Sequence, residues 1–589
     1  MEHATHASTE TRYFSSDVTD LSEARKTEVV ELADGETFEL EIAPVAKRLG
    51  ESRVRMLAYN GSIPGPTLKV KQGATVILNV TNHTELEATV HWHGLRLENR
   101  YDGTHETQAP IPVGGMFTYH VHCPDPGVYW FHPHIREDYG QEMGLYANII
   151  VEPSDPHYWP PVHREIALTL DDVLLEDGAV APFSRSETNY VAMGRFGETM
   201  LIAGETDLRL PAAKNEVVRF FLTDTANTRV FRVGLPGTKM KVVGGDSGRY
   251  EHEEFVDELV LAPSERAVVD VLFEQPGEVV LEHRSQESSY VLATIDVSDE
   301  PVESPLPLNF HELRASADFE RERRRIEALL ETQPDKTLAF VAEMDVGADV
   351  EVGQAVFTCP MHPDIQASWA DKCPTCGMKL LVLEGETERP TAYACPMHAE
   401  VVATWTATCP KCGMTLRATG EGAADAERDH SDEHGHEHHG HAHEAPGGIE
   451  WEDDMVEVNR TTTPANMRWK IVDRETGRVN HAIDWTFRVG DQLKIRLVNE
   501  MDSDHPMHHP FHVHGAGRFL IVARDGVLEP NLVWKDTVLV RTGETVDILL
   551  DVTNPGRWMA HCHIAEHHES GMMFSFNVEP AEGATQALQ

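Results

Sequence analysis

The chain has 589 residues, of which 41% are hydrophobic, so it is long enough to form several domains with packed cores. Acidic residues outnumber basic ones by 97 to 50, and the formal net charge of −47 argues against nucleic acid as a partner, because nucleic-acid binding requires a basic surface. No apolar run approaches the ~20 residues of a transmembrane helix, so no transmembrane segment is predicted.

The N-terminal residues 1–26 are polar and predict a flexible segment. They lack the apolar core of a signal peptide, so export is either absent or directed by a segment that this sequence does not contain. From residue 27 onwards, short alternating apolar runs recur between Gly and Pro turns, which is typical of β-sandwiches. A break near residues 152–161 indicates two domains, 27–155 and 156–300.

A helical linker is predicted over residues 301–335, because apolar residues recur there at helical spacing among charged ones. Residues 336–347 return to strand-like alternation, and this alternation resumes over residues 450–580. We therefore expect a third sandwich that is divided by a long insertion.

The insertion contains two copies of a cysteine motif, in which Cys395 repeats Cys359 at an offset of 36 residues. Each copy has CxxH followed by CxxC, and the two modules span residues 352–384 and 390–418. Three thiolates and one imidazole complete a tetrahedral zinc site, whereas the methionines of the motif are soft ligands that favour Cu(I). Structural zinc and transient copper binding both stay open for the predicted ligands, which are Cys359, His362, Cys373, Cys376, Cys395, His398, Cys409 and Cys412.

Residues 421–448 contain the low-complexity tract DHSDEHGHEHHGHAHE. Its polarity predicts a disordered segment without a packed core. The histidines of this segment either bind metal weakly or belong to a solvated linker.

Four HxH pairs occur in the strand-like sequence of the first and third sandwiches. Residues two apart on a strand project from the same face, with Cα atoms about 6–7 Å apart, so each pair can place two imidazoles on neighbouring metal ions. Imidazole binds copper, zinc, iron and nickel, so the pairs do not select the metal. Together they predict one cluster at a domain interface, with the ligands His91, His93, His132, His134, His512, His514, His561 and His563.

A single cysteine selects copper. Cys562 lies between the two histidines of the last pair, so on a strand its side chain faces away from theirs. His509, His567 and Met572 can reach the sulfur on that side. Two imidazoles, one thiolate and a weak thioether form the ligand set of a blue-copper electron-transfer site. The peptide neighbours of Cys562 would then join this site to the histidine cluster by a short covalent path.

On these motifs the chain resembles the three-domain multicopper oxidases, the superfamily of laccases and cuprous oxidases. The early stretch YNGSIPGPTLKVKQG fits as well, and the resemblance covers residues 27–345 and 450–580. It implies an all-β fold of three cupredoxin-like Greek-key β-sandwich domains. The inserted modules resemble the small heavy-metal-binding domains attached to copper and heavy-metal exporters, and we expect both modules and the His-rich segment to be inserted in the third domain.

The resemblance implies four copper ions, one of type 1, one of type 2 and two of type 3. A reducing substrate would give single electrons to the type 1 copper, and the three-copper cluster would reduce O2 to two waters. Additional Cu(I) or zinc would occupy the inserted modules. The implied ligands are His509, Cys562, His567 and Met572 for type 1, His91 and His512 for type 2, and His93, His132, His134, His514, His561 and His563 for the type 3 pair.

Water formation consumes protons, so acids near the cluster are candidate catalytic residues. Asp102 matches a proton-delivering acid of the family, although an aspartate in the turn YDG is also a common structural residue. In many bacterial relatives a glutamate follows the second type 1 histidine, but here His568 occupies that position. Glu566 and Glu569 lie nearby, and the sequence leaves open which of these residues delivers protons.

Three functions fit these motifs, and the preferred one is a cuprous oxidase in copper tolerance, in which the insertion gathers Cu(I) for the type 1 site. A laccase-like phenol oxidase is the alternative. A non-enzymatic copper buffer is disfavoured, because a buffer has no need of the Cys562 bridge. The expected partners are O2 and either Cu(I) or a phenolic reductant, and the resemblance implies a periplasmic, cell-envelope or secreted location. His505 and His508 either help a metal substrate to approach or are solvated loop residues.

Overall fold

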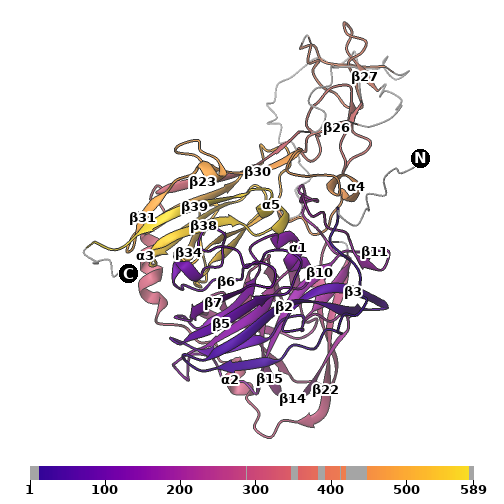
Figure 1. Cartoon of the computed structure of the whole chain (residues 1–589). Coiled ribbons are helices and arrows are strands. Elements are labelled where there is room, and N and C mark those ends of the chain that lie inside the picture. Colours follow the sequence, from indigo (N-terminus) through magenta and orange to yellow (C-terminus); the bar gives the residue numbers. More distant parts are fainter. Residues whose placement is uncertain are drawn as a thin grey trace.

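The structure is a computed structural model, and it describes residues 12–286, 288–345, 356–382, 392–411, 413–419 and 447–582. Strands account for 46% of it and helices for 7%, which confirms the predicted all-β class. Three sandwiches pack together, and a projection that carries the insertion rises from them (Figure 1). Three parts of the predicted organisation lie outside the described residues, namely residues 1–11, nearly all of the His-rich segment 421–448, and Cys412.

The first sandwich packs a five-stranded sheet, β1-β4-β9-β8-β6, against a four-stranded sheet, β3-β2-β5-β7. Every second residue of β5 is buried, as the alternating sequence predicts for a strand with one face on the core. The strands are β1 (Val29–Leu32), β2 (Thr37–Leu49), β3 (Ser52–Tyr59), β4 (Thr67–Lys71), β5 (Thr75–Asn82), β6 (His91–His93), β7 (Met116–His122), β8 (Gly127–His132) and β9 (Ala147–Glu152).

The second sandwich lies between the other two in sequence and contacts both. Its central strands β15 and β20 are buried along their whole length, because neighbouring domains cover the face that would otherwise meet water. The sheets run β13-β10-β15-β20-β17-β18 and β14-β22-β21-β16-β19. The strands are β10 (Arg164–Val173), β11 (Leu175–Glu176), β12 (Ala179–Val180), β13 (Thr199–Ile202), β14 (Leu208–Lys214), β15 (Glu216–Asp224), β16 (Phe231–Gly234), β17 (Met240–Gly245), β18 (Gly248–Val256), β19 (Glu258–Leu261), β20 (Arg266–Phe273), β21 (Gly277–Arg284) and β22 (Ser289–Pro301).

The third sandwich is assembled from both sides of the insertion. β23 precedes the insertion and pairs with β30 and β32, which follow it. The sheets run β30-β23-β32-β37-β34-β35 and β31-β39-β38-β33-β36. The strands are β23 (Lys336–Met344), β30 (Met467–Asp473), β31 (Thr486–Arg488), β32 (Gln492–Asn499), β33 (His509–Val513), β34 (Gly517–Arg524), β35 (Val527–Leu528), β36 (Thr537–Val540), β37 (Thr545–Val552), β38 (Gly556–Cys562) and β39 (Met573–Glu579).

The inserted cysteine motifs form one small six-stranded sheet, β26-β24-β25-β28-β27-β29, at the top of Figure 1. Its strands have two residues each, which is short because the turns around the cysteines interrupt the chain. They are β24 (Phe357–Thr358), β25 (Gln366–Ala367), β26 (Leu381–Val382), β27 (Tyr393–Ala394), β28 (Val402–Ala403) and β29 (Arg417–Ala418).

The linker between the second and third sandwiches contains less helix than its pattern predicts. The residues between its two helices run extended beside β18, where Arg314 O accepts the Glu253 N–H at 2.9 Å and Glu251 O accepts the Ser316 N–H at 2.7 Å. Phe319 and Ile326 pack on the third sandwich. The helical segments of the described chain are η2 (Asn99–Tyr101), α1 (Glu137–Glu142), α2 (Pro307–His311), α3 (Phe319–Leu329), α4 (Val456–Asn459), η3 (Asn480–Ala482) and α5 (Ala565–Glu569).

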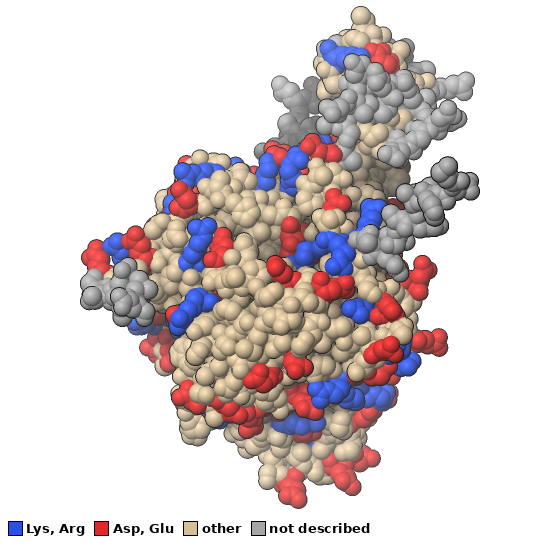
Figure 2. Space-filling view, in the orientation of Figure 1, with Lys and Arg blue, Asp and Glu red and all other residues tan. Residues whose placement is uncertain are grey.

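Two short helices mark the place where the first sandwich meets the third. α1 follows the last strand histidine of the first sandwich, α5 follows Cys562 in the third, and the two helices are in contact (Figure 1). Acidic and basic side chains are interspersed over the face in Figure 2, so the excess negative charge is not gathered into one patch there. Among the described helices none is long and apolar enough to cross a membrane.

Candidate metal centre

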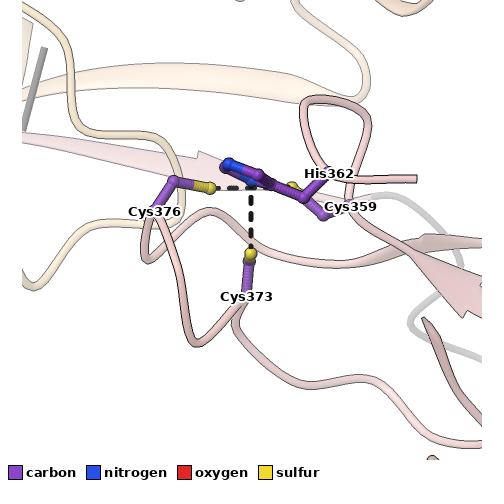
Figure 3. A group of neighbouring side chains, drawn as sticks. All are labelled: Cys359, His362, Cys373 and Cys376. Carbon is purple, nitrogen blue, oxygen red and sulfur yellow. Dashed lines mark hydrogen bonds between the residues drawn. The ribbon is translucent and has the colours of Figure 1, made fainter. Parts of the chain in front are cut away.

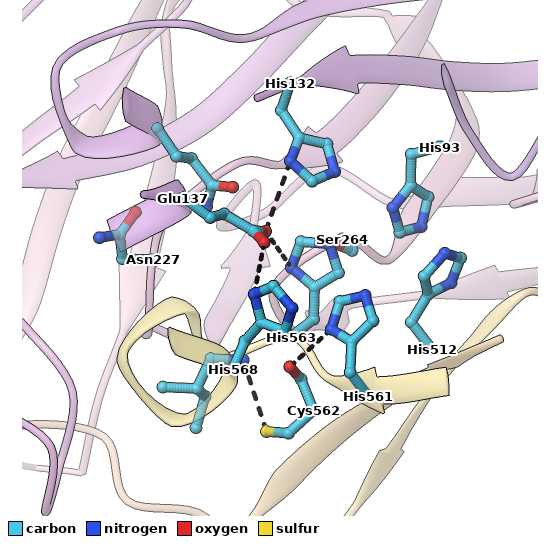
Figure 4. A network of polar contacts seen from close by, with 12 residues as sticks. His93, His132, Glu137, Asn227, Ser264, His512, His561, Cys562, His563 and His568 are labelled. Carbon is cyan, nitrogen blue, oxygen red and sulfur yellow. Dashed lines mark hydrogen bonds and ion pairs between the residues drawn. The ribbon is translucent and has the colours of Figure 1, made fainter. Parts of the chain in front are cut away.

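Pairs of neighbouring strands bring the predicted histidines together. β6 pairs with β8 so that His91 lies opposite His132, and β33 pairs with β38 so that His512 lies opposite His561. The first and third sandwiches therefore each present two HxH pairs from adjacent strands, and the two sets meet at the interface between these domains (Figure 4). All eight side chains are buried, with at most 3% of any residue exposed.

The eight histidines form three groups, two of which share His93, in which the potential ligand nitrogens lie within 4.8 Å of one another. Each group combines residues of the first sandwich with residues of the third. Neither sandwich could therefore complete any of the groups alone. The groups are His91, His93 and His512; His93, His132 and His563; and His134, His514 and His561.

The nitrogens that face the centre of the cluster fit metal ions. Within the part of the chain that the structure describes, Nε2 of His91, Nε2 of His132 and Nδ1 of His93 are buried without a hydrogen-bond partner. His514 Nε2 and His561 Nε2 approach each other to 3.1 Å. Two such lone pairs repel each other unless a proton or a cation lies between them, and an unpaired buried polar atom costs free energy. A cation among the rings removes both penalties.

Burial also keeps these imidazoles in the form that binds metals. Desolvation lowers the pKa of every cluster histidine, and it brings the pKa of His91 and of His514 to about 3. A neutral imidazole has a free lone pair for a metal ion. The rings are therefore available as ligands over the physiological range.

Asp102 lies behind the cluster. Its carbonyl oxygen is 2.7 Å from His91 Nδ1, and its Oδ2 atom is 2.8 Å from His514 Nδ1. These contacts leave the Nε2 atoms of both rings free to face inwards. Burial raises the pKa of Asp102 to about 6. The turn requires the next residue to be Gly103, because a Cβ atom there would lie 1.9 Å from the Val90 carbonyl oxygen.

Glu137 contacts the cluster, and the sequence analysis did not select it. Its Oε1 atom lies 3.4 Å from His132 Nδ1 and 3.6 Å from His563 Nδ1, and its Oε2 atom lies 2.9 Å from His568 Nδ1 (Figure 4). Burial raises the pKa of this carboxyl group. Its position in the sequence could have pointed to this role, because Glu137 lies three residues after His134, at the start of a helix that faces α5.

The two glutamates that the sequence analysis selected lie one step farther from the cluster. Glu569 Oε1 accepts the backbone N–H of Glu137 at 2.8 Å. Glu566 accepts hydrogen bonds from the Asn227 amide at 3.1 Å and the Thr228 hydroxyl at 3.2 Å, both in the second sandwich. Burial raises the pKa of each glutamate to about 7.

Cys562 faces away from the cluster, and two predicted partners surround its sulfur. Cys562 Sγ lies 3.5 Å from His509 Nδ1 and 3.8 Å from His567 Nδ1. Met572 is fully buried in the same hydrophobic core as Cys562. Burial raises the pKa of the free thiol. Coordination by a metal ion would replace that proton and leave a thiolate ligand.

The ring of Trp469 covers the imidazoles beside Cys562. Its centroid lies 4.1 Å from that of His567 and 4.9 Å from that of His509. His505 and His508 are also buried, with 2% and 0% of each residue exposed, so they are not solvated loop residues. His505 Nε2 lies 3.1 Å from the sulfur of Met193.

The predicted ligands of the first module converge on one point (Figure 3). His362 Nδ1 lies 3.6 Å from the sulfurs of Cys359 and Cys373, and the sulfurs of Cys359 and Cys376 are 3.6 Å apart. Such spacings fit the four ligands of a tetrahedral site.

The second module repeats this arrangement over its described residues. His398 Nδ1 lies 3.7 Å from Cys395 Sγ and 3.6 Å from Cys409 Sγ. The two modules thus bring together three thiolates with an imidazole, and two thiolates with an imidazole, respectively.

Comparisons with known proteins agree with this geometry. Residues 43–156 and 453–582 match families described as "Multicopper oxidase", and residues 356–381 match the "Heavy metal binding domain". The chain is similar to Multicopper oxidase MmcO of Mycobacterium tuberculosis, with 30% identity over 42% of this chain and 53% of that protein. It is also similar to Copper resistance protein A of Pseudomonas syringae pv. tomato, with 26% identity over 47% of this chain and 52% of that protein. The chain thus spans about half the length of these two relatives.

Longer alignments show the fold. Laccase-13 of Arabidopsis thaliana is 22% identical over 90% of this chain and 91% of its own length. Among solved structures, a multicopper oxidase from Campylobacter jejuni, described as a metallo-oxidase, aligns over 95% of this chain and 98% of its own, with a TM-score of 0.58 and 19% identity. A laccase-like CueO from Ochrobactrum sp. aligns over 94% and 100%, with a TM-score of 0.60 and 18% identity.

Proposed function

Because this chain belongs to the multicopper oxidase family, whose domains imply bound copper and O2 as the oxidant, we propose that it oxidises Cu(I). One observation carries the proposal. Cys562 lies between two imidazoles on one side of β38, while its neighbours His561 and His563 lie in the histidine cluster on the other. An electron that reaches the Cys562 sulfur can therefore pass to the cluster through covalent bonds, because the neighbouring residues His561 and His563 belong to it.

The residues fit four copper ions. The mixed set around Cys562 suits copper because it combines a thiolate, imidazoles and a thioether. The inward-facing lone pairs of the cluster suit three further ions. We assign His509, Cys562, His567 and Met572 to type 1, His91 and His512 to type 2, and His93, His132, His134, His514, His561 and His563 to type 3.

Bound copper would supply the redox chemistry, in which four Cu(I) ions would each lose one electron to become Cu(II), and the four electrons with four protons would reduce O2 to two waters. The protein holds the imidazoles in a buried site from which side chains exclude bulk water. Asp102 and the backbone around it orient two of the rings. Trp469 shields the imidazoles beside Cys562.

We propose Asp102 and Glu137 as the acids that hold protons for the reaction, since each touches the rear nitrogens of cluster histidines. His568 occupies the position of the glutamate in many relatives, and it pairs with Glu137 at 2.9 Å. Glu569 would act through Glu137, whose backbone N–H it accepts, whereas the Glu566 carboxylate accepts hydrogen bonds from Asn227 and Thr228.

The inserted modules favour Cu(I) over a phenol as the reductant. Their thiolates and neighbouring thioethers are soft ligands, and the first module packs on the sandwich that carries Cys562. The Copper resistance protein A relative supports this direction, whereas the laccase relatives keep phenol oxidation as the second candidate. Copper storage without turnover is disfavoured, because storage does not need the link between Cys562 and the cluster. A copper-tolerance role in the periplasm, the cell envelope or outside the cell belongs to the same proposal.

Oxygen uptake tests the choice of substrate. The full chain and a variant that lacks residues 352–448 are compared, each with Cu(I) and with a phenol. We expect the deletion to slow Cu(I) oxidation at low Cu(I) concentration and to spare phenol oxidation. Phenol turnover that dominates in both proteins, with Cu(I) oxidation unaffected by the deletion, would instead identify a phenol oxidase.

A further inference from the structure

The cysteine loop of the first module is attached to the loop that leads into the Cys562 site. Lys379 donates its backbone N–H to Asp504 O at 2.9 Å and its ammonium group to Met344 O at 2.6 Å. Lys372 Nζ lies 2.8 Å from Asp502 Oδ1 and 3.2 Å from Ser503 O. Both lysines flank Cys373 and Cys376 in sequence, so the metal-binding turn itself forms the contact.

Methionine side chains extend from this contact into the hydrophobic core of the third sandwich. Met378, which is 2% exposed, belongs to the same hydrophobic core as Cys562, and Met361 packs against that core. This core holds or contacts eight of the 19 methionines of the chain, which are Met193, Met344, Met361, Met378, Met455, Met467, Met507 and Met572. Such a concentration matters because thioethers bind Cu(I) and poorly bind harder cations.

The attached loop also carries an imidazole next to a thioether. His505 follows Asp504 directly, and its Nε2 atom lies 3.1 Å from the sulfur of Met193. The Trp469 ring lies beside His505, at 5.9 Å between centroids, and beside the imidazoles around Cys562. Asp504, which the first module contacts, is therefore adjacent in sequence to His505, and the buried pair of His505 and Met193 borders the proposed type 1 site.

The second module lacks the means to dock in this way. Thr408 and Thr415 stand at the positions that correspond to Lys372 and Lys379 at the repeat offset of 36 residues. Its two motif methionines, Met397 and Met414, are 71% and 38% exposed, whereas the matching methionines of the first module face the sandwich. The two copies share the predicted ligands and the motif methionines but differ at both lysine positions that bond to the third sandwich.

The second module is instead carried by the first. β25 of the first module pairs with β28 of the second, with Ala367 opposite Ala403. Beside this pair, Ser368 donates its backbone N–H to Val402 O, and Val402 donates its backbone N–H to Ser368 Oγ. In Figure 1, β27 of the second module lies farther from the sandwiches than β26 of the first. The two metal sites are thus held in a fixed order outward from the third sandwich.

We propose that the first module is a docked copper donor and the second a copper collector, so that Cu(I) passes from the second module to the first and then to Met193 and His505. Each transfer is an exchange of thiolate, thioether and imidazole ligands on Cu(I), with no change in oxidation state. The electron leaves the ion only at the end of this path. The inference rests on the proposed Cu(I) oxidation and adds the route by which the ion arrives.

The test compares the full-length copper-loaded protein with a Lys372→Glu, Lys379→Glu double variant, which sets glutamates against Asp502 and Asp504. Two substitutions are needed because a single exposed ion pair contributes little to the stability of a contact. Lys239→Glu is the matched control, since this exposed lysine pairs with Asp257 in the second sandwich and lies outside both modules. Hydrogen exchange of residues 500–508 reports docking, and metal content reports whether the modules still bind copper.

Delivery is measured without O2, as the bleaching of the type 1 absorption band by Cu(I) held at low free concentration with a chelator. We expect bleaching to slow by about tenfold or more in the double variant, because docking raises the effective concentration of the donated ion. Lys239→Glu should bleach at the wild-type rate. Lys372→Asp combined with Asp502→Lys should restore part of the loss.

Each result decides a different point. If residues 500–508 exchange faster in the double variant while bleaching keeps its wild-type rate, the docked module is not the donor. Equal slowing by Lys239→Glu would attribute the effect to lost positive charge and would overturn docked delivery. A wild-type protein whose type 1 band is bleached by a phenol and not by Cu(I) would overturn the proposed function, and this inference with it.

Discussion

At the scale of single residues, Cys562 supplies the thiolate of the proposed type 1 site. Cys562→Ser should abolish the type 1 absorption band and O2 uptake with either Cu(I) or a phenol, because a hydroxyl group is a poor ligand for a soft metal. The cluster histidines keep their contacts, so copper analysis should find one ion fewer than in the wild-type protein. Cys123→Ala, which changes a buried thiol in the core of the first sandwich, should keep both the band and the activity.

Glu137 gives a second prediction at this scale. Glu137→Gln keeps the size of the side chain and removes the charge that faces His132, His563 and His568. Turnover should fall by about 10²-fold, which is the usual effect of losing a positioned proton-transfer group. The type 1 band and the copper content should persist. A variant that loses copper in proportion to its activity would instead assign Glu137 to holding the rings.

The sequence could supply some of these residues and not others, for a physical reason. An HxH pair on a strand and a cysteine between two histidines are local patterns with a period of two, so spacing alone predicts which side chains share a face. Glu137 depends on a different fact, namely that α1 of the first sandwich meets α5 of the third. No local pattern encodes that meeting. The same limit applies to Met193 and His505, which are far apart in sequence and touch in space.

At the scale of elements, β20 of the second sandwich connects all three domains through one residue. Arg266 at its start donates to Val128 O of the first sandwich at 3.1 Å and to Asp536 Oδ1 of the third at 2.7 Å. That same Asp536 oxygen lies 3.0 Å from His93 Nε2. The second sandwich supplies none of the proposed ligands, yet this strand fixes a carboxylate that orients one of them.

Arg266→Gln should therefore destabilise the whole protein. It leaves the buried Asp536 without its cation, and breaking a buried ion pair costs about 3–5 kcal/mol. Denaturant unfolding should give a clearly lower midpoint. Arg209→Gln, which breaks ion pairs that are about half exposed, should shift the midpoint far less. Equal effects of the two substitutions would show that the junction does not depend on Arg266.

The linker shows how neighbouring elements override a local pattern. Its apolar spacing predicts one long helix, but the stretch around Arg314 is held extended by hydrogen bonds to residues 251 and 253 of β18. Backbone groups that find partners on a strand edge have no need of helical ones. Within the linker, Pro307–His311 and Phe319–Leu329 are helical, and in the longer helix Phe319 and Ile326 bury their side chains on the third sandwich.

At the scale of the whole molecule, the sandwiches and the inserted modules should unfold separately. Each sandwich has a large core, whereas the modules share one small core in which four of the eleven buried members are cysteines proposed as metal ligands. A unit of this kind depends on bound metal for its folding. Two-state unfolding is therefore not expected for the full chain.

Removal of metal from the first module tests this division. Cys359→Ser combined with Cys373→Ser should leave the thermal midpoint of the sandwiches and the type 1 band unchanged, because neither residue belongs to the core around Cys562. Hydrogen exchange should accelerate over residues 356–382 and also over 392–411, since β28 would lose its partner strand β25. Cys395→Ser should accelerate exchange over 392–411 and leave residues 372–379 protected, because their contacts are with the third sandwich. Loss of the sandwich transition together with that of the modules would mean that the projection is a structural part of the third domain and not a separable carrier of copper.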